Sequence, residues 1–337
     1  MYLRKCFHKD IETCESLFFE VIITLFRCVS FHTPQGGESL STDFPIVKLV
    51  GSKKTVLVGA TKRPILIGER INPTNRKKLI EAIKAKDFAY IQNEAKNQVA
   101  AGADCLDINV GVPGEDEHEK SNMITAIQAV QDVVEVPLAL DSSNPAVIEA
   151  GLKVVKGRPM INSTTGEEKR LTAILPLAKE YNVPVLGLAL DDAGIPAQAA
   201  RRMDIAKMIK DRANKMGIQD DQLLIDPLAL ACATSQEGGK ASLDTIGYIR
   251  NTLKLNTSIG LSNISFGMPE RPKLNAAFLL LCVGQGLTSF IGNPMDKDIQ
   301  FAVKSVGLMW GEDKFGMNYV RYCKANFPAP EAPKKVA

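Results

Sequence analysis

The chain has 337 residues and a formal net charge of +3 at pH 7, and 45% of its residues are hydrophobic. It is long enough for one large domain or two ordinary ones, and its small charge gives no indication of binding to nucleic acid or an anionic membrane. Its seven cysteines show no CxxC spacing, and three histidines are too few for a His-rich metal site. We therefore predict a cytoplasmic protein with reduced core cysteines.

Residues 1–40 show neither helix-capping residues nor a clear hydrophobic periodicity. Residues 16–31 are apolar, but two charged residues interrupt them and they are short for a bilayer span. No small-residue cleavage pattern follows them, so we predict neither a signal peptide nor a membrane anchor. The purine-rich codons of a Gly-Gly-Glu sequence at residues 36–38 can spell a ribosome-binding site. Our hypothesis is that the native chain starts near Leu40 and that residues 1–40 are a non-native or disordered extension.

Two short β-branched runs follow, at residues 45–50 and 55–59, with a Gly-Ser-Lys-Lys turn between them. This pattern predicts a β-hairpin within residues 41–63. We expect the hairpin to cover the bottom of the structure that follows. At the other end of the chain, residues 326–337 are rich in proline and alanine and are predicted to be a tail.

From residue 64 the chain alternates between short apolar strands and amphipathic helices. The eight predicted strands lie within residues 64–72, 105–111, 137–142, 159–163, 184–191, 223–228, 259–265 and 288–293. A single helix is predicted over residues 76–101, and each later strand is also followed by a helix. Strands that are apolar on both faces belong to parallel sheets. Residues 64–325 therefore predict a (β/α)₈ TIM barrel of the usual size.

A doubly wound open sheet is the alternative fold. It is disfavoured because the first strand-to-helix turn, residues 69–77, has no GxGxxG sequence.

The predicted strands share a further property, because most of them end in acidic or amide side chains. These strand-end residues are Glu69, Asn72, Asp107, Asn109, Asp141, Asn162, Asp191, Asp226, Ser262 and Asn263. In a barrel the carboxyl ends of the strands face one cavity, where ligands bind. Any one of these side chains could instead cap the following helix. A ring of several favours a binding site, because caps alone would use Ser and Thr as freely.

The same strand ends lack the residues of several common active sites. They show no HxH or HExxH pair for zinc, no Lys for a Schiff base and no GxSxG nucleophile. A magnesium site is chemically open to the carboxylates but has no supporting spacing. Carboxylates and amides can accept and donate hydrogen bonds along the edge of a flat heterocycle. The 2-amino-4-oxo-pyrimidine edge of a pterin is one such ligand.

Six sequence motifs in order resemble the methyltetrahydrofolate:corrinoid protein methyltransferases. They are GERIN (68–72), LDINVG (106–111), LDSSN (140–144), MINST (160–164), IDPL (225–228) and GLSNIS (260–265). The resemblance runs from about residue 64 to about residue 324. It implies a pterin-binding TIM barrel, as in the folate domain of cobalamin-dependent methionine synthase and, more distantly, in dihydropteroate synthase.

The resemblance also implies roles for individual residues. Pterin ligands fall on Asp141, Asn162 and Asp226. Asn263 corresponds to the family residue that stays close to pterin N5 during the reaction. Arg271 corresponds to a loop arginine that helps to close the site. Further pterin-site positions match Glu69, Asn72, Asn109, Gly260 and Ser262. Dihydropteroate synthase has a Lys near the position of Asn263, and this departure argues against that enzyme.

The implied activity is transfer of the N5 methyl group between 5-methyltetrahydrofolate and the cobalt of a corrinoid. The corrinoid is carried by a partner protein, the folate is a substrate, no metal is bound by the chain itself, and a homodimer is implied. Because a neutral Asn263 cannot donate the proton that N5 needs, we expect it to hydrogen-bond protonated N5 in the transition state. The alternatives are a dihydropteroate-synthase-like enzyme and a non-catalytic tetrahydrofolate-binding module. The partner, the upstream methyl donor and the direction of transfer stay open.

Overall fold

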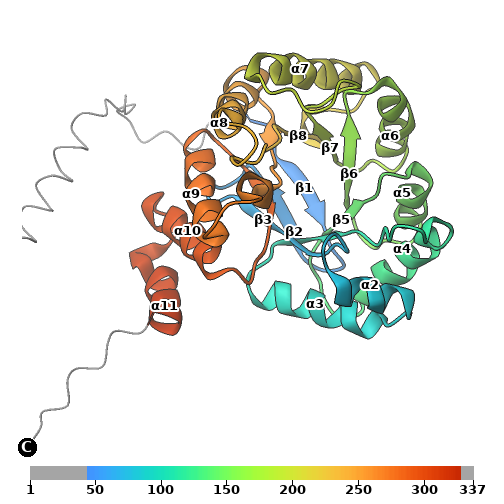
Figure 1. Cartoon of the computed structure of the whole chain (residues 1–337), viewed down its shortest axis with the longest axis horizontal. Helices are drawn as coiled ribbons and strands as arrows, with labels where there is room; N and C mark the ends of the chain where they lie inside the picture. Colours follow the sequence, from blue (N-terminus) through green and yellow to red (C-terminus); the bar gives the residue numbers. More distant parts are fainter. Residues whose placement is uncertain (1–43, 328–337) are drawn as a thin grey trace, which may run out of the picture. The chain divides into compact units, whose positions relative to one another are not determined.

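The computed structural model describes residues 44–327 (Figure 1). The described chain begins with an antiparallel hairpin, formed by β1 (Val47–Val50) and β2 (Thr55–Val58). The valines and leucines of one face, such as Val47 and Leu49, are buried against the barrel interior. Arg158, just before a barrel strand, exchanges two backbone hydrogen bonds with Val50, of 2.9 and 2.7 Å. The predicted hairpin is therefore confirmed.

Eight parallel strands form a nearly closed barrel. They are β3 (Ile65–Ile71), β4 (Cys105–Ile108), β5 (Leu138–Asp141), β6 (Met160–Thr165), β7 (Val185–Leu188), β8 (Leu223–Asp226), β9 (Asn256–Thr257) and β10 (Ser289–Gly292). The hydrogen-bonded order runs β10-β3-β4-β5-β6-β7-β8-β9. The ring closes where the N–H of Ile291 donates to the carbonyl of Ile259 at 2.8 Å, beside an isolated parallel bridge between Gly260 and Ile291. The predicted (β/α)₈ barrel is confirmed.

Helices surround the strands (Figure 1). They are α2 (Lys77–Lys84), α3 (Phe88–Ala100), α4 (Asp116–Gln131), α5 (Pro145–Leu152), α6 (Glu168–Glu180), α7 (Ala199–Lys215), α8 (Gly238–Tyr248), α9 (Arg271–Gly284), α10 (Lys297–Met309) and α11 (Met317–Asn326). The apolar faces of α2 to α10 pack against the outer faces of the strands and form the main core, whereas α11 has no buried residue and lies outside the ring of helices (Figure 1). Parallel strands buried on both faces need this cover, which explains their continuous apolar sequences.

The structure differs from the sequence prediction in three elements. The single helix expected over residues 76–101 is two helices, because Lys86 adopts a left-handed φ of 56° and Asp87 caps α3 by accepting from the N–H of Tyr90. The strand expected over residues 259–265 starts earlier, as β9, and only Ile259 and Gly260 of that range pair with β10, because Leu261–Ser265 form a 3₁₀ helix. Helix α11 was not predicted.

The expected extension at residues 1–40 lies outside the described residues, as does most of the predicted tail. Among residues 44–327, no helix is long and apolar enough to cross a membrane.

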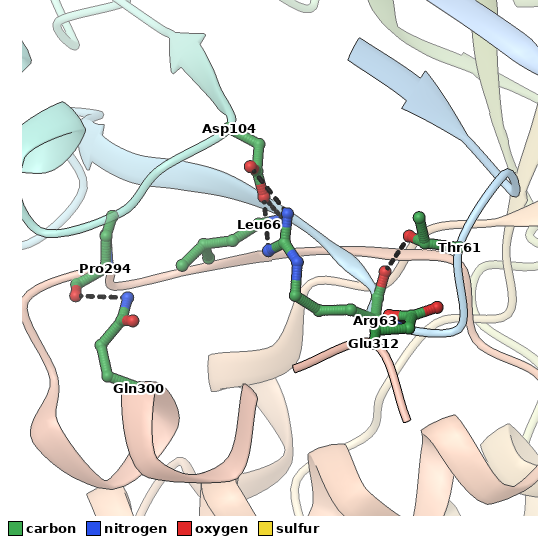
Figure 2. A network of polar contacts seen from close by, with 7 residues as sticks. All are labelled: Thr61, Arg63, Leu66, Asp104, Pro294, Gln300 and Glu312. Atoms are coloured by element: carbon green, nitrogen blue, oxygen red, sulfur yellow. Dashed lines mark hydrogen bonds and ion pairs between the residues drawn. The ribbon is translucent and has the colours of Figure 1, made fainter. Parts of the chain in front are cut away.

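A polar network ties the start of two strands to the loop after α10 (Figure 2). Arg63 donates two hydrogen bonds of 3.0 Å to Asp104, and Asp104 also accepts from the N–H of Leu66 at 3.0 Å. The Glu312 carboxylate accepts from the backbone N–H groups of Lys62 and Arg63. These contacts lie before β3 and β4, at the amino ends of the strands, where a barrel is stabilised rather than active.

Candidate active site

A cavity of about 450 Å³ lies at the carboxyl ends of the barrel strands. Eight of the ten expected site residues line it, and they are Glu69, Asn72, Asp141, Asn162, Gly260, Ser262, Asn263 and Arg271. Asn109 and Asp226 do not line it, although each is bonded to a residue that does. Asp191 lies apart, because its carboxylate pairs with Arg201 and accepts from the N–H of Ala193.

Two other cavities, of about 490 and 510 Å³, lie beside α10 and α11. The larger is lined by the ion pair of Arg63 and Asp104 and by Glu312, whose polar groups already satisfy one another (Figure 2). Size therefore does not identify the site. The strand-end cavity is distinguished by its convergent carboxyl and amide groups.

Two amide–carboxyl pairs stand at the ends of β4, β5 and β6. Asn162 donates to Asp107 at 3.0 Å, and Asn109 donates to Asp141 at 3.0 Å. Asp141 and Asn162 are partners in the β5–β6 register, which puts their side chains at the same height. In each pair the amide NH₂ group faces the carboxyl group, which fixes the orientation of the asparagine side chain. Each carboxyl group keeps an oxygen that can accept from a ligand.

Burial makes these carboxyl groups hold protons unusually well. It raises the pKa of Asp141 to about 6, although the hydrogen bond from Asn109 and the charge of Arg170 act in the opposite direction. The pKa of Asp107 is raised further, by burial and then by the charge of Asp141. Burial also raises the pKa of Glu69. Within this wall Asp107 therefore holds a proton more readily than Asp141 does.

Asp226 is buried behind the cavity wall. Its carboxylate accepts from the backbone N–H of Leu228 at 2.7 Å and from that of Gly260 at 3.3 Å. Burial raises its pKa to about 7 despite these hydrogen bonds. The second bond joins the end of β8 to the turn that carries Asn263.

The turn after β9 brings together the remaining side chains of the rim. Ser262 donates to Glu69 at 2.9 Å. Arg271 donates to the carbonyl of Ser262 at 3.1 Å and to the hydroxyl of Ser265 at 3.0 Å, and its guanidinium lies 4.6 Å from the Phe266 ring centroid. The Asn263 side chain is exposed at the cavity and forms no hydrogen bond with any residue among 44–327. Its amide is therefore available to a ligand.

Strand irregularities decide which strand-end side chains reach the cavity. Between Gly68 and Ile71, β3 has one more residue than the facing part of β4, so Glu69 and its neighbour Arg70 both line the cavity. A similar shift lies between Asn162 and Thr164 on β6. Bulges of this kind redirect side chains beside active sites.

Some contributors were not predicted as site residues. Asp107 belonged to the predicted ring of strand ends, but no role was assigned to it. Arg170, on α6, donates to the carbonyls of Ser142 and Ser163, which joins the loops after β5 and β6. Glu119, on α4, accepts from Ser142 at 2.6 Å. Nothing in the helix sequences distinguishes these two residues from ordinary polar surface residues.

No group of three or more His, Cys, Asp or Glu residues within the described part of the chain is arranged to hold a metal ion.

Comparisons with known proteins identify the family of this chain. The family model described as "Pterin binding enzyme" matches residues 68–293. The methylcorrinoid:tetrahydrofolate methyltransferase of Eubacterium limosum is 31% identical over 263 residues, which are 76% of this chain and 94% of that protein. The methionine synthase of Mycobacterium tuberculosis is 34% identical over 240 residues, 67% of this chain. The chain spans only 20% of that much longer protein.

Solved structures of dihydropteroate synthases share the fold. The Yersinia pestis enzyme has a TM-score of 0.58 at 18% identity, and covers 78% of this chain and 99% of its own. The Thermus thermophilus enzyme has a TM-score of 0.56 at 20% identity, and covers 78% of this chain and 98% of its own. At such low identity these structures bear on the fold alone. From the family match and the cavity together, this chain belongs to the family of pterin-binding enzymes.

Proposed function

We propose that this chain is a methyltransferase that moves the N5 methyl group between 5-methyltetrahydrofolate and the cobalt of a corrinoid carried by a partner protein. The observation that carries the proposal is the alignment with the methylcorrinoid:tetrahydrofolate methyltransferase, which covers 94% of that protein. The carboxyl and amide groups of the strand-end cavity give this likeness a chemical meaning, because they suit the polar edge of a pterin.

In this proposal the β4–β6 wall binds the pterin. The Asp141 carboxylate accepts two parallel N–H bonds from the 2-amino-pyrimidine edge, and Asn162, held by Asp107, offers its carbonyl oxygen. Asn109 and Asp226 do not contact the pterin. Asn109 positions Asp141 and Asp226 positions Gly260, each through a hydrogen bond. Glu69, Asn72 and Ser262 complete the rim, and Arg271 holds the loop over it.

Asn263 is the proposed catalytic residue. When the methyl group leaves N5 for the cobalt, the N5–C bond breaks and its electron pair stays on N5, which must therefore carry a proton. Asn263 hydrogen-bonds this protonated nitrogen through its free amide, and the proton itself comes from solvent. The bond is stronger in the transition state than in the ground state, which makes it catalytic. The cobalt that accepts or donates the methyl group is supplied by the partner's corrinoid.

The test is a methyl-transfer assay. Purified protein is mixed with 5-methyltetrahydrofolate and Co(I) cobalamin, and the cobalt absorbance is followed as tetrahydrofolate forms. Enzyme-dependent transfer supports the proposal. If the protein binds the folate but transfers its methyl group neither to free cobalamin nor to a protein-bound corrinoid, the protein is a binding module.

Dihydropteroate synthase is the second candidate, because solved structures of that enzyme share the fold. The 3₁₀ helix after β9 contains Ser262-Asn263-Ile264, where the resemblance implies a Lys in the synthase. We infer that the condensing activity is absent. An assay with a dihydropterin pyrophosphate and p-aminobenzoate checks this, and product formation would reverse the assignment.

We also propose a homodimer in the cytoplasm. Large apolar side chains are exposed along α9, α10 and the segment leading into α11, and they are Leu281, Met309, Trp310, Phe315 and Met317. An exposed apolar surface of this kind favours association with another protein surface. The molar mass measured by light scattering, for the wild type and for Leu281→Asp, tests the dimer. The carboxylate introduced at residue 281 should dissociate it. The described cysteines form no disulfides, which fits a reducing compartment.

A further inference from the structure

One buried cation has no part in the proposed methyl transfer. Arg202, near the start of α7, is fully buried and does not line the strand-end cavity. Burial lowers its pKa, and the charge of Asp226 acts in the opposite direction. Its Nη2 group forms no hydrogen bond with any residue among 44–327. Burying a guanidinium that is not fully paired is costly, and an apolar side chain of similar volume is often as stable. Stability alone therefore does not explain this residue.

The other nitrogens of Arg202 hold backbone carbonyls at the carboxyl ends of two strands. Nε donates to the carbonyl of Pro196, in the loop between β7 and α7, at 2.7 Å. Nη1 donates to the carbonyls of Pro227 and Leu228, directly after β8, at 3.1 and 2.7 Å. The planar guanidinium therefore joins the loops after β7 and β8 through main-chain contacts.

Arg202 thereby holds the peptide group that faces Asp226. The carbonyl of Pro227 and the N–H of Leu228 belong to one planar peptide group. Arg202 donates to this carbonyl, and the N–H donates to the Asp226 carboxyl group at 2.7 Å. The next peptide is held as well, because the carbonyl of Leu228 accepts from Arg202 and, at 2.6 Å, from the Ser242 hydroxyl on α8. Between these two peptides Leu228 has a φ of 64°, a left-handed conformation that residues other than glycine seldom adopt without such support.

These contacts continue to the proposed catalytic amide. The second oxygen of the Asp226 carboxyl group accepts from the N–H of Gly260 at 3.3 Å. A Cβ atom at Gly260 would lie 2.9 Å from Nδ2 of Asn263, so the place of Gly260 limits the place of the amide. We propose that Arg202 is a positioning residue for methyl transfer, which acts on the Asn263 amide through the Asp226 carboxyl group. This inference rests on the proposed function, and adds to it a residue that touches no substrate.

The test starts from Arg202→Met, which replaces the arginine by an unbranched side chain without a donor. The single-turnover rate of methyl transfer to Co(I) cobalamin should fall about 10- to 100-fold, because small displacements of a catalytic group reduce rates strongly. The folate dissociation constant should rise by a smaller factor. Arg201→Met is the matched control, because Arg201 is the neighbouring residue on α7 and pairs with Asp191 at the surface. It should change the rate by less than about twofold.

A double variant separates positioning from a merely structural role. If Arg202 acts through Asn263, its effect should be small once Asn263→Ala has removed the amide. Arg202→Met should then lower the remaining rate by less than about threefold. An equal loss in both backgrounds would show a structural role and overturn the inference. Urea denaturation of the same proteins checks that each is folded under the assay conditions.

Ser242→Ala keeps the inference testable if Arg202→Met does not fold. This variant removes the second donor to the Leu228 carbonyl and leaves Arg202 in place. It should lower the rate about two- to tenfold, and again have little effect in the Asn263→Ala background. A normal rate in folded Arg202→Met, or in Ser242→Ala where Arg202→Met is unfolded, overturns the role of Arg202 and leaves the proposed function standing. If the wild type transfers no methyl group, both fall.

Discussion

The carboxylate of Asp226 accepts a hydrogen bond of 3.3 Å from the backbone N–H of Gly260, so the end of β8 holds the turn on which Asn263 stands. Gly260 in turn leaves space for the Asn263 amide, because a Cβ atom at Gly260 would lie 2.9 Å from Nδ2 of Asn263. The position of the proposed catalytic amide is therefore set by the backbone beneath it. Strand-end sites need this kind of support, since small displacements reduce rates strongly.

Gly260→Ala tests that dependence. Its φ of −70° suits alanine, so the backbone should accept the change while the Asn263 amide shifts. We expect the methyl-transfer rate to fall about 10- to 100-fold, with a smaller loss of folate affinity. Gly284→Ala, where a Cβ atom would meet nothing within 4 Å, is the control. A normal rate in Gly260→Ala would show that Asn263 is not confined by this turn.

Asn263→Ala should lower the transfer rate more than it weakens binding. Loss of one hydrogen bond made in the transition state typically costs about 10²–10³ in rate. The folate dissociation constant should change less, because the proposed bond from Asn263 to N5 is stronger in the transition state than in the ground state. Single-turnover kinetics and equilibrium titration of the same preparation separate the two effects. Equal losses in rate and affinity would reduce Asn263 to an ordinary pterin ligand.

Folate binding should weaken as pH falls through about 6. Burial raises the pKa of Asp141 to about 6, and the proposed pterin contact needs the carboxylate. Below that pH the group is increasingly protonated and can no longer accept both N–H bonds. Asp141→Asn should bind more weakly at pH 7.5 and lose this pH dependence. Titrations of both proteins from pH 5 to 8 check the expectation, and an unchanged pH dependence in the variant would assign it to another group.

Arg170 is a positioning residue whose loss should move that pH dependence. It donates to the carbonyls of Ser142 and Ser163, and its charge opposes the rise in the pKa of Asp141. Arg170→Gln should therefore shift the midpoint of folate binding to higher pH. Arg170→Lys keeps the charge and should restore most of the midpoint, although it loses some of the carbonyl contacts. A purely structural role would lower stability in both variants and leave the midpoint where it is.

Most of the fold could be predicted from the sequence, because it depends on repeated local signals. The doubly apolar strands and the absence of a Gly-rich first turn favoured a barrel, and the structure has one. The errors lie where tertiary contacts override a pattern. The apolar period of residues 76–101 is continuous, but Lys86 turns left-handed and breaks the helix. The segment at Ile259 reads as a strand, but the chain turns into a 3₁₀ helix at Leu261.

The candidate site was less accessible to prediction. The strand-end residues converge on one cavity because parallel strands end at the same rim. Which of them face the cavity depends on single extra residues, such as the one near Glu69 and Arg70 on β3, and no sequence signal reports them. That Asp226 lies behind Gly260, and that Asp107 holds Asn162, follow from side-chain packing alone.

Asp226 should make the protein less stable as pH rises. Burial raises its pKa to about 7, whereas the pKa of an aspartate in an unfolded chain is about 3.9. Between these values the folded state keeps a proton that the unfolded state has released. The stabilisation is complete below about pH 4 and is lost as pH rises through about 7, by up to about 1.4 kcal/mol per pH unit.

Asp226→Asn removes this titration and leaves the other groups in place. The difference in unfolding free energy, wild type minus variant, should therefore fall between pH 4.5 and 8, as measured by urea denaturation at each pH. The variant should also bind folate more weakly at pH 8, because an amide cannot accept from the N–H groups of both Leu228 and Gly260. Parallel stability profiles would mean that Asp226 is ionised in the folded protein throughout this range, and that backbone hydrogen bonds outweigh its burial.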